Sequence, residues 1–232
     1  MTAGTIVLWR HGRTAYNATT RMQGSIDIPL DDVGRWQVEQ AAADLARRFA
    51  PSRVVASNLG RAIDTAGYLA ELVDVPVETD ARLRERSFGE WEGLNIEEIA
   101  ERWPAEYELW KRGEDPARGS AETRPAVAER FAEAVVELAA TLDREETLVV
   151  VSHGAAISLG ITTLLGLDPV TWRGLVGLHN AHWSVLRAST GRAGPPWRLE
   201  SHNLGPSVRM ADWHAGVPSE GLPSSAADAL RP

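Results

Sequence analysis

Two histidines that follow short apolar runs are the residues of this chain best suited to chemistry. His11 comes shortly after residues 5–9 (TIVLW), His153 comes shortly after residues 147–151 (TLVVV), and each histidine is followed by glycine. Apolar, β-branched runs of this length are typical of strands that are buried on both faces of an α/β sheet. Because such sheets bind ligands at the carboxyl ends of their strands, we expect both imidazoles to face one crevice.

Arg10, His11 and Gly12 together contain the groups that nucleophilic attack on a phosphoryl group requires. An imidazole nitrogen can take up the phosphoryl group, a guanidinium can hold its oxygens, and a glycine lets the backbone approach closely. The triplet alone is a weak signal, because an isolated histidine at a strand end more often makes a structural hydrogen bond.

Strands and helices alternate along most of the chain. Apolar periodicity predicts helices over 34–49, 60–72, 95–103, 123–142 and 155–165, and strands over 5–9, 53–56, 147–151, 181–188 and 197–201. This alternation predicts the α/β class, with three αβα layers and a doubly wound, mostly parallel sheet. Ser57 and Asn58 are favourable capping residues before the second helix, and Asn95 with Glu98 resembles a capping pair.

Two regions are predicted to lie outside the regular elements. Residues 111–120 are rich in helix breakers, which predicts a mobile surface excursion. We expect one catalytic domain over residues 1–204, followed by a poorly ordered extension, 205–232, in which small residues, glycine and proline replace the apolar pattern.

The composition excludes several classes of function. The 232 residues carry a formal net charge of -8, which disfavours a broad binding surface for nucleic acid or anionic membrane. We therefore expect no nucleic-acid and no membrane partner, and any anion site must be a local cluster of arginines. The chain has no cysteine, so disulfides, thiolate catalysis and zinc–cysteine sites are excluded.

The chain has neither a targeting pattern at its amino terminus nor a window that approaches the length of a membrane span. We therefore expect a cytoplasmic protein. Many apolar positions could face either the core or a second copy, so a homodimer is compatible with the sequence and a monomer is too.

Five short segments, two of which contain the histidines, occur in a specific order. They are RHGRTAYN at 10–17, MQG at 22–24, SNLGRAIDT at 57–65, LRERSFGEWEG at 83–93 and SHG at 152–154. In this order they resemble the histidine phosphatase superfamily, the phosphoglycerate-mutase-like proteins, over about residues 5–204. The resemblance implies a phosphoglycerate-mutase-like fold. It also implies a phosphomonoester hydrolase that needs no metal or other cofactor and acts through a phosphohistidine intermediate.

The resemblance assigns roles to individual residues. It makes His11 the nucleophile that becomes phosphohistidine, and it makes Arg10, Arg61 and His153 the pocket that binds the phosphoryl group. Three donors that can carry positive charge would stabilise the charge on the oxygens of a phosphoryl group. The alternative role for these residues is a surface salt bridge. This alternative has more weight for Arg61 than for Arg10 and His153.

Glu85 matches the proton donor to the leaving oxygen in the family. An alkoxide is a poor leaving group, so a carboxylic acid would assist its departure and could then activate water. Glu90 and Glu92 are local rivals, since a charge-rich loop is usually a solvated face. Three further residues match the mouth of the phosphate or substrate site, with turn chemistry as the alternative for each: Asn17, Gln23 and Gly24.

Three functions stay open at this level. The resemblance favours a phosphatase acting on a small phosphorylated metabolite, and the first alternative is phosphoglycerate mutase, which uses the same intermediate. True mutases usually carry a Tyr-Gly pair where this chain has Phe88 and Gly89, so residues 85–93 resemble the phosphatase branch. The second alternative is a noncatalytic phosphate-binding module, against which the joint presence of all the motif residues argues.

Within the phosphatases, residues 21–24, 180–183 and 197–199 look similar to the glucosyl-3-phosphoglycerate phosphatases. Glucosyl-3-phosphoglycerate is therefore one candidate substrate, beside phosphoglycolate, sugar phosphates and cofactor phosphates. His179 and His182 lack further ligands at a metal-binding spacing, so we expect structural or surface roles for them.

Overall fold

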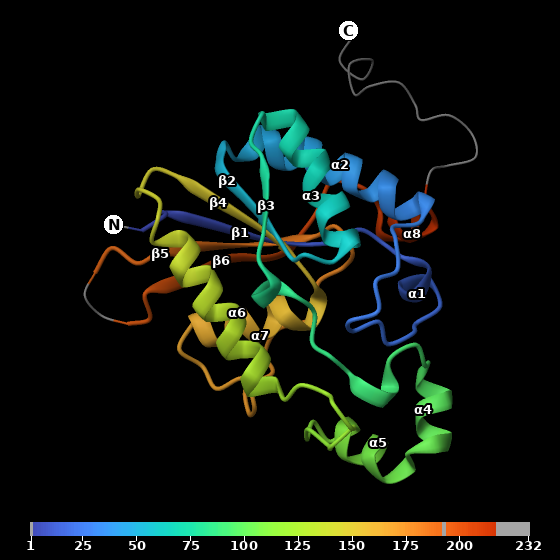
Figure 1. Cartoon of the computed structure of the whole chain (residues 1–232). Helices are drawn as coiled ribbons and strands as arrows, with labels where there is room; N and C mark the ends of the chain where they lie inside the picture. The colour runs from blue at the N-terminus through green and yellow to red at the C-terminus, as the bar shows by residue number, and fades with distance from the viewer. Residues whose placement is uncertain (1, 192–193, 217–232) are drawn as a thin grey trace, which may run out of the picture.

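The computed structural model describes residues 2–191 and 194–216, and these build a six-stranded sheet between two layers of helices (Figure 1). The strands are β1 (Thr5–Arg10), β2 (Pro51–Ala56), β3 (Val77–Thr79), β4 (Thr147–Ser152), β5 (Trp183–Ala188) and β6 (Trp197–Leu204). Their order is β3-β2-β4-β1-β5-β6. Neighbours from β3 to β1 pair in parallel, whereas β1–β5 and β5–β6 are antiparallel, so the predicted mostly parallel α/β sheet is confirmed.

Helices cover both faces of the sheet. On one face lie α2 (Asp32–Arg48), α3 (Gly60–Val73) and α8 (Met210–Ala215), and on the other lie α6 (Arg124–Ala139) and α7 (Gly154–Leu164) (Figure 1). Side chains of the central strands alternate between these two cores. In β1, Ile6 packs with the α6 and α7 side and Val7 with the α2 and α3 side, which explains the continuous apolar run.

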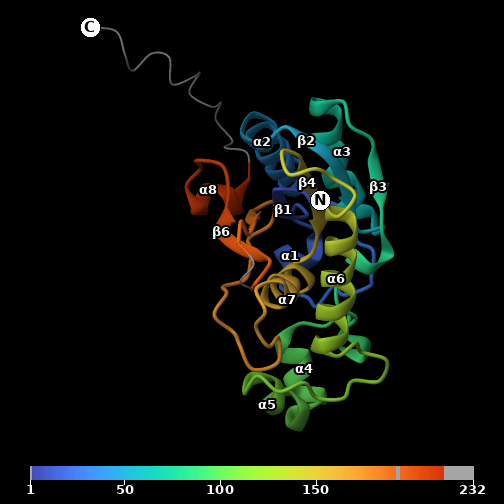
Figure 2. The ribbon, with the colours of Figure 1, turned by 90° about the vertical axis from the view of Figure 1, so that its left-hand side faces the viewer.

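The smaller helices lie outside these layers. They are α1 (Ala15–Ala18), α4 (Ile96–Arg102) and α5 (Pro104–Lys111), with 3-10 turns at Ala81–Leu83 and Gly89–Trp91. Figures 1 and 2 both show α4 and α5 together at one end of the molecule. Asn95 and Glu98 form the predicted capping box at the start of α4. The apolar pattern did not predict α5 or β3.

The predicted caps of α3 are wrong. The N-cap is Leu59, which makes no side-chain capping bond. Ser57 lies two residues too early and accepts the Leu59 N–H at 3.3 Å, while the Asn58 oxygen accepts from Arg84 instead. Favourable residue types were present, but the Ser57 hydroxyl bonds within its own turn and the Asn58 side chain makes a tertiary contact.

Residues 111–120 run over the surface, as predicted, and most of them are exposed, but the segment is anchored at two of its charged residues. Arg118 is buried, and the Asp115 carboxylate pairs with both Arg86 and Arg118. The second Asp115 oxygen accepts the backbone N–H of Arg124 at 2.8 Å. These charge-assisted bonds fasten the segment to the start of α6.

The first part of the predicted extension is ordered. Residues 210–215 form α8, and Trp213 is buried against α2, where its carbonyl oxygen accepts from Gln37 at 2.8 Å. The prediction of poor order therefore does not hold for this helix, and residues 217–232 lie outside the described residues. Within the described part of the chain, no helix is long and apolar enough to cross a membrane.

Candidate active site

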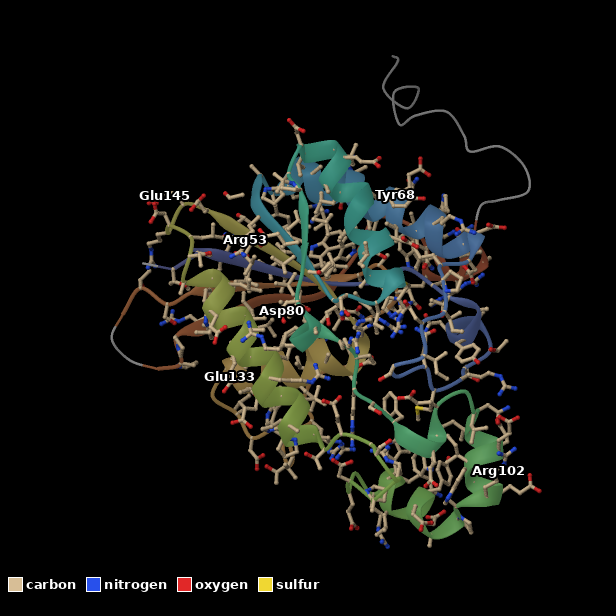
Figure 3. All side chains as sticks on the ribbon, viewed as in Figure 1. Arg53, Tyr68, Asp80, Arg102, Glu133 and Glu145 are labelled. Atoms are coloured by element: carbon tan, nitrogen blue, oxygen red, sulfur yellow. The ribbon has the colours of Figure 1, made fainter. Side chains whose placement is uncertain are left out.

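The carboxyl ends of β1 and β4 bring the two histidines together. These strands are parallel neighbours with Arg10 opposite Ser152, so the next residue of each strand end, His11 and His153, enters the same space. The ring centroids lie 5.0 Å apart, and both side chains are buried. In Figure 3, Glu145 lies before β4, at the amino ends of the parallel strands, and Asp80 lies after β3, at their carboxyl ends. The two histidines follow β1 and β4 and therefore lie at the carboxyl ends.

Hydrogen bonds give the two imidazoles opposite tautomers. His11 Nδ1 lies 2.7 Å from the Gly12 carbonyl oxygen, which can only accept, so Nδ1 carries the proton and Nε2 keeps a free lone pair. His153 Nδ1 lies 3.2 Å from Arg61 Nε, which can only donate, so here the proton is on Nε2. One ring is therefore a potential nucleophile and the other a hydrogen-bond donor.

Arg61 supports the pocket from α3. Its side chain is fully buried, and besides His153 it donates to the carbonyl oxygens of Gly24 and Ile26, each at 2.8 Å. Burial lowers the pKa of Arg61 to about 10, so the group remains a cation at neutral pH. The sequence alternative of a surface salt bridge does not describe this side chain, although Asp27 lies 3.6 Å from Nη1.

Arg10 reaches the pocket from the end of β1. Its guanidinium donates to the Leu178 carbonyl oxygen and lies beside the N-terminus of α7, where a Cβ on Gly154 would be 3.5 Å from Cζ. Arg10 Nε is buried and has no hydrogen-bond partner among the described residues, and the same holds for His153 Nε2. Two buried donors thus lack an acceptor in a pocket where an anion would supply one.

The electrostatics of the pocket keep the imidazoles neutral. Burial, followed by the positive charges of Arg61 and Arg10, lowers the pKa of His11 well below its ordinary value. The pKa of His153 is lowered well below its ordinary value too, first by burial and then by Arg61. The pocket therefore combines two arginine cations with an uncharged imidazole that can act as a nucleophile.

Glu85 lies at the N-terminus of α7. Its two carboxylate oxygens accept the backbone N–H groups of Ala155 at 3.1 Å and Ala156 at 3.0 Å. Burial lowers the pKa of Arg10 and the charge of Glu85 opposes this shift, which places the carboxylate within electrostatic range of the pocket. Glu90 is exposed, and Glu92 accepts hydrogen bonds within its own loop, so neither rival is held against α7.

The three predicted mouth residues frame the loop after β1. Asn17 and Gln23 both accept from Thr14, at 3.1 Å and 2.6 Å from its hydroxyl oxygen. Gly24 has a φ of +53°, which favours glycine, and a Cβ there would clash with Glu92. The residues thus meet around one loop, where turn chemistry accounts for much of their bonding.

Asn180 is a site residue that the sequence reasoning missed as an individual group. Its side-chain nitrogen lies 3.2 Å from the carbonyl oxygen of His11, 3.3 Å from that of Gly12 and 3.1 Å from Asn17 Oδ1. It therefore holds the backbone on both sides of the candidate nucleophile. The resemblance of residues 180–183 was the only signal for it, because the contacts join residues that are 168–169 positions apart.

This arrangement can carry out phosphoryl transfer with protein groups alone. A lone pair, a set of donors for phosphoryl oxygens and a carboxylate converge at one edge of the sheet. Among residues 2–191 and 194–216, no group of three or more acidic or histidine side chains is arranged to hold a metal ion.

Comparisons with known proteins show a family and several relatives to which this chain is similar. A family described as the histidine phosphatase superfamily (branch 1) matches residues 6–204. A glucosyl-3-phosphoglycerate phosphatase of Mycolicibacterium vanbaalenii is 38% identical over 218 residues, covering 88% of this chain and 96% of the relative. A solved mycobacterial glucosyl-3-phosphoglycerate phosphatase in complex with VO3 has a TM-score of 0.78 at 36% identity, covering 86% of this chain and 98% of that chain.

A more distant relative carries a different name. A probable phosphoglycerate mutase of Escherichia coli O1:K1 is 33% identical over 168 residues, covering 70% of this chain and 75% of the relative. The phosphatases thus match nearly their whole length, and the mutase matches less of both chains.

Proposed function

This chain belongs to the histidine phosphatase superfamily, and from that premise we propose that it hydrolyses its phosphomonoester through a phosphohistidine on His11. One observation carries the proposal, namely the opposite tautomers of the paired imidazoles. His11 presents a free Nε2 lone pair in the same buried space where Arg10 Nε and His153 Nε2 lack an acceptor. A nucleophile and two unused donors are what a phosphoryl group requires.

In the first step, His11 Nε2 attacks phosphorus. A nitrogen–phosphorus bond forms while the bond from phosphorus to the alcohol oxygen breaks. Arg10, His153 and Arg61 stabilise the charge on the phosphoryl oxygens, and Glu85, which enters this step as the carboxylic acid, gives its proton to the departing oxygen and becomes the carboxylate. The neutral state of His11, which follows from its lowered pKa, keeps the lone pair available at neutral pH.

In the second step, water attacks the phosphohistidine. The Glu85 carboxylate takes a proton from the water, the new oxygen–phosphorus bond forms, and the nitrogen–phosphorus bond breaks to release phosphate. The position of Glu85 at the N-terminus of α7 supports the base role, because backbone N–H groups of the helix hold the carboxylate beside the pocket and stabilise its charge.

We propose glucosyl-3-phosphoglycerate as the substrate. The support comes from relatives of that name, which match this chain over nearly their whole length, and from the three sequence segments that resemble them. The phosphate pocket itself would accept any phosphomonoester, so the choice must be made by residues around it.

A panel of phosphomonoesters tests the proposal. It contains glucosyl-3-phosphoglycerate, 3-phosphoglycerate, phosphoserine and phosphoglycolate, each scored for free phosphate and for isomerised product. We expect phosphate without isomer, with the highest kcat/KM for glucosyl-3-phosphoglycerate. Isomerisation of 3-phosphoglycerate without phosphate would instead establish the mutase, and a higher kcat/KM for another ester would overturn the proposed substrate.

Labelling tests the intermediate separately. Quenching the reaction with a radiolabelled phosphomonoester should leave label on the protein that is stable to alkali and released by acid, as expected for a phosphoramidate. The label should map to the peptide with His11, and a label on any other residue would contradict the mechanism.

A further inference from the structure

A second cleft lies beside the phosphate pocket and shares Arg10 with it. The cleft has a volume of about 420 Å³, and its polar lining consists of Arg10, Arg13, Asn17, His179, Asn180 and His214. We refer to it as the histidine cleft. Its lining contains two arginines, two histidines and two amides, and no acidic side chain, so its chemistry favours an anion.

The two histidines of this cleft present ring nitrogens that the protein does not use. The rings of His179 and His214 lie 5.5 Å apart between centroids and are tilted by 68°. Within the described ranges, no hydrogen bond is made by either ring. The pKa of His179 is lowered by burial and then by His214 and Arg10, so in the free protein this ring is a neutral donor.

The frame of the histidine cleft is built from three distant parts of the chain. Arg13 donates to the His214 carbonyl oxygen at 2.8 Å, which ties the loop after β1 to α8. The buried Trp213 donates from its indole nitrogen to the Asn180 carbonyl oxygen at 3.0 Å, which ties α8 to the segment before β5. His214 therefore projects from a helix end that is fixed on both sides.

The charge of the cleft suits a singly charged anion. Arg13 Nε already pairs with Asp31 Oδ2 at 2.9 Å, which neutralises part of its charge. The rings of His179 and His214 and a half-compensated arginine can hold a planar carboxylate, whereas a phosphate dianion would need more positive charge. The phosphoryl group has the buried side chains of His11, His153 and Arg61 as its own site.

We propose that the histidine cleft binds a carboxylate of the substrate while the phosphoryl group occupies the pocket at His11. This inference rests on the proposed function and deepens it, because it assigns named residues to the carboxylate of the substrate. His179 and His214 are then residues that determine specificity, because they contact a part of the substrate that does not react.

Matched substrates test the inference. One pair is 3-phosphoglycerate and glycerol 3-phosphate, which has a hydroxymethyl group in place of the carboxylate, and the second pair is the glucosylated form of each. For the wild type we expect a higher kcat/KM with the carboxylate in both pairs. In the double variant His179→Ala with His214→Ala, this preference should fall about tenfold through a higher KM, with kcat nearly unchanged.

Arg209→Ala is the matched control, because it removes an exposed positive charge beside α8 that does not line the cleft. It should keep the wild-type preference. The inference would be overturned if the wild type showed no preference for the carboxylate substrate. It would also be overturned if the double variant kept the wild-type preference, or if its kcat/KM fell equally for both substrates of a pair. Failure of the proposed function looks different, since phosphate release would then not depend on His11 for any ester.

Discussion

The phosphate pocket and the histidine cleft share Arg10, but the two sites are built in different ways. In the pocket, His11, His153 and Arg61 are at most 2% exposed, and each is held by hydrogen bonds at or beside a strand end or helix. In the cleft, His179 is half-buried and His214 is exposed, and they project from a loop and a short helix.

This difference divides the work of recognition. Buried cations and neutral imidazoles act strongly on a phosphoryl group because little water screens them, so changes in the pocket should alter the rate of the chemical step. Partly solvated groups in the cleft act weakly and should mainly alter which substrate binds. The sizes of mutational effects are therefore a direct test of the comparison.

The largest effect is expected for His11→Ala. Without a nucleophile, kcat should fall by at least about 10⁴-fold, and no phosphoenzyme should form. Phosphate release from glucosyl-3-phosphoglycerate measures the rate, and circular dichroism checks that the fold is intact. His153→Ala sharpens the assignment, because a variant that lacks only a donor should lose about 10²- to 10³-fold and still become labelled.

His202→Ala is the control for the loss of a ring, since His202 bonds Ser184 and the Val176 carbonyl oxygen instead of entering the pocket. It should keep activity within about threefold of the wild type. Hydrolysis at a normal rate by His11→Ala would show that the buried imidazole is structural. It would also contradict the view that the pocket controls the chemical step and the cleft controls substrate binding.

Glu85→Gln is expected to have the next largest effect, and its size should depend on the leaving group. For an alkyl phosphate, loss of the general acid should lower kcat by about 10²- to 10⁴-fold. For p-nitrophenyl phosphate, formation of the phosphoenzyme should slow much less, because p-nitrophenolate leaves without a proton. Burst kinetics separate that step from hydrolysis of the intermediate.

Glu90→Gln serves as the comparison, because Glu90 is an exposed carboxylate of the same loop. Glu90→Gln should leave the rates with the alkyl phosphate and with p-nitrophenyl phosphate unchanged. An equal loss with alkyl and aryl phosphates in Glu85→Gln would instead indicate that this carboxylate only positions α7.

The same comparison explains which parts of the molecule the sequence could predict. The two histidines of the pocket lie at strand ends, and the buried runs of β1 and β4 carry a pattern that local reasoning can detect. Parallel pairing of such strands then brings His11 and His153 together. The positions of these residues therefore followed from short stretches of chain.

The cleft depends on contacts that no short stretch contains. The order of α8 comes from Trp213, whose partners Gln37 and Asn180 lie 176 and 33 positions away. A segment of small and polar residues around one buried tryptophan has the composition of a loose tail, and only its distant partners give it structure. The burial of Arg118 in a breaker-rich segment has the same kind of cause, because its guanidinium lies 4.8 Å from the centroid of the Trp91 ring, which belongs to a distant turn.

Arg61→Met should have a smaller effect than loss of the general acid, and it should also change the pH profile. Since the Arg61 charge lowers the pKa of His11, its removal should raise that pKa. We expect the acid limb of kcat/KM below pH 6.5 in the wild type, and in the variant it should move to higher pH while the plateau falls about 10²-fold. Arg61→Lys keeps the charge, so the acid limb of its kcat/KM profile should stay in place even if its plateau falls. If the acid limb moved equally in Arg61→Met and Arg61→Lys, the charge of Arg61 would not be the cause.

The smallest effect concerns His182, which lies behind the histidine cleft, with its ring 5.2 Å from that of His179 and 5.3 Å from that of Trp213. Burial lowers the pKa of His182 to about 4, below the value of about 6.5 for an unfolded histidine. The unfolded chain therefore binds the proton more readily, and stability should be lost as the pH falls from about 6.5 to 4.

His182→Gln should make this decline in Tm shallower by a few degrees, with the residual slope due to His11 and His153. Measurements at pH 8, where histidine is neutral in both states, give the cost of the substitution itself. An unchanged slope would show that the frame behind the cleft is solvated, and the histidine cleft would then differ from the phosphate pocket even more than its geometry indicates.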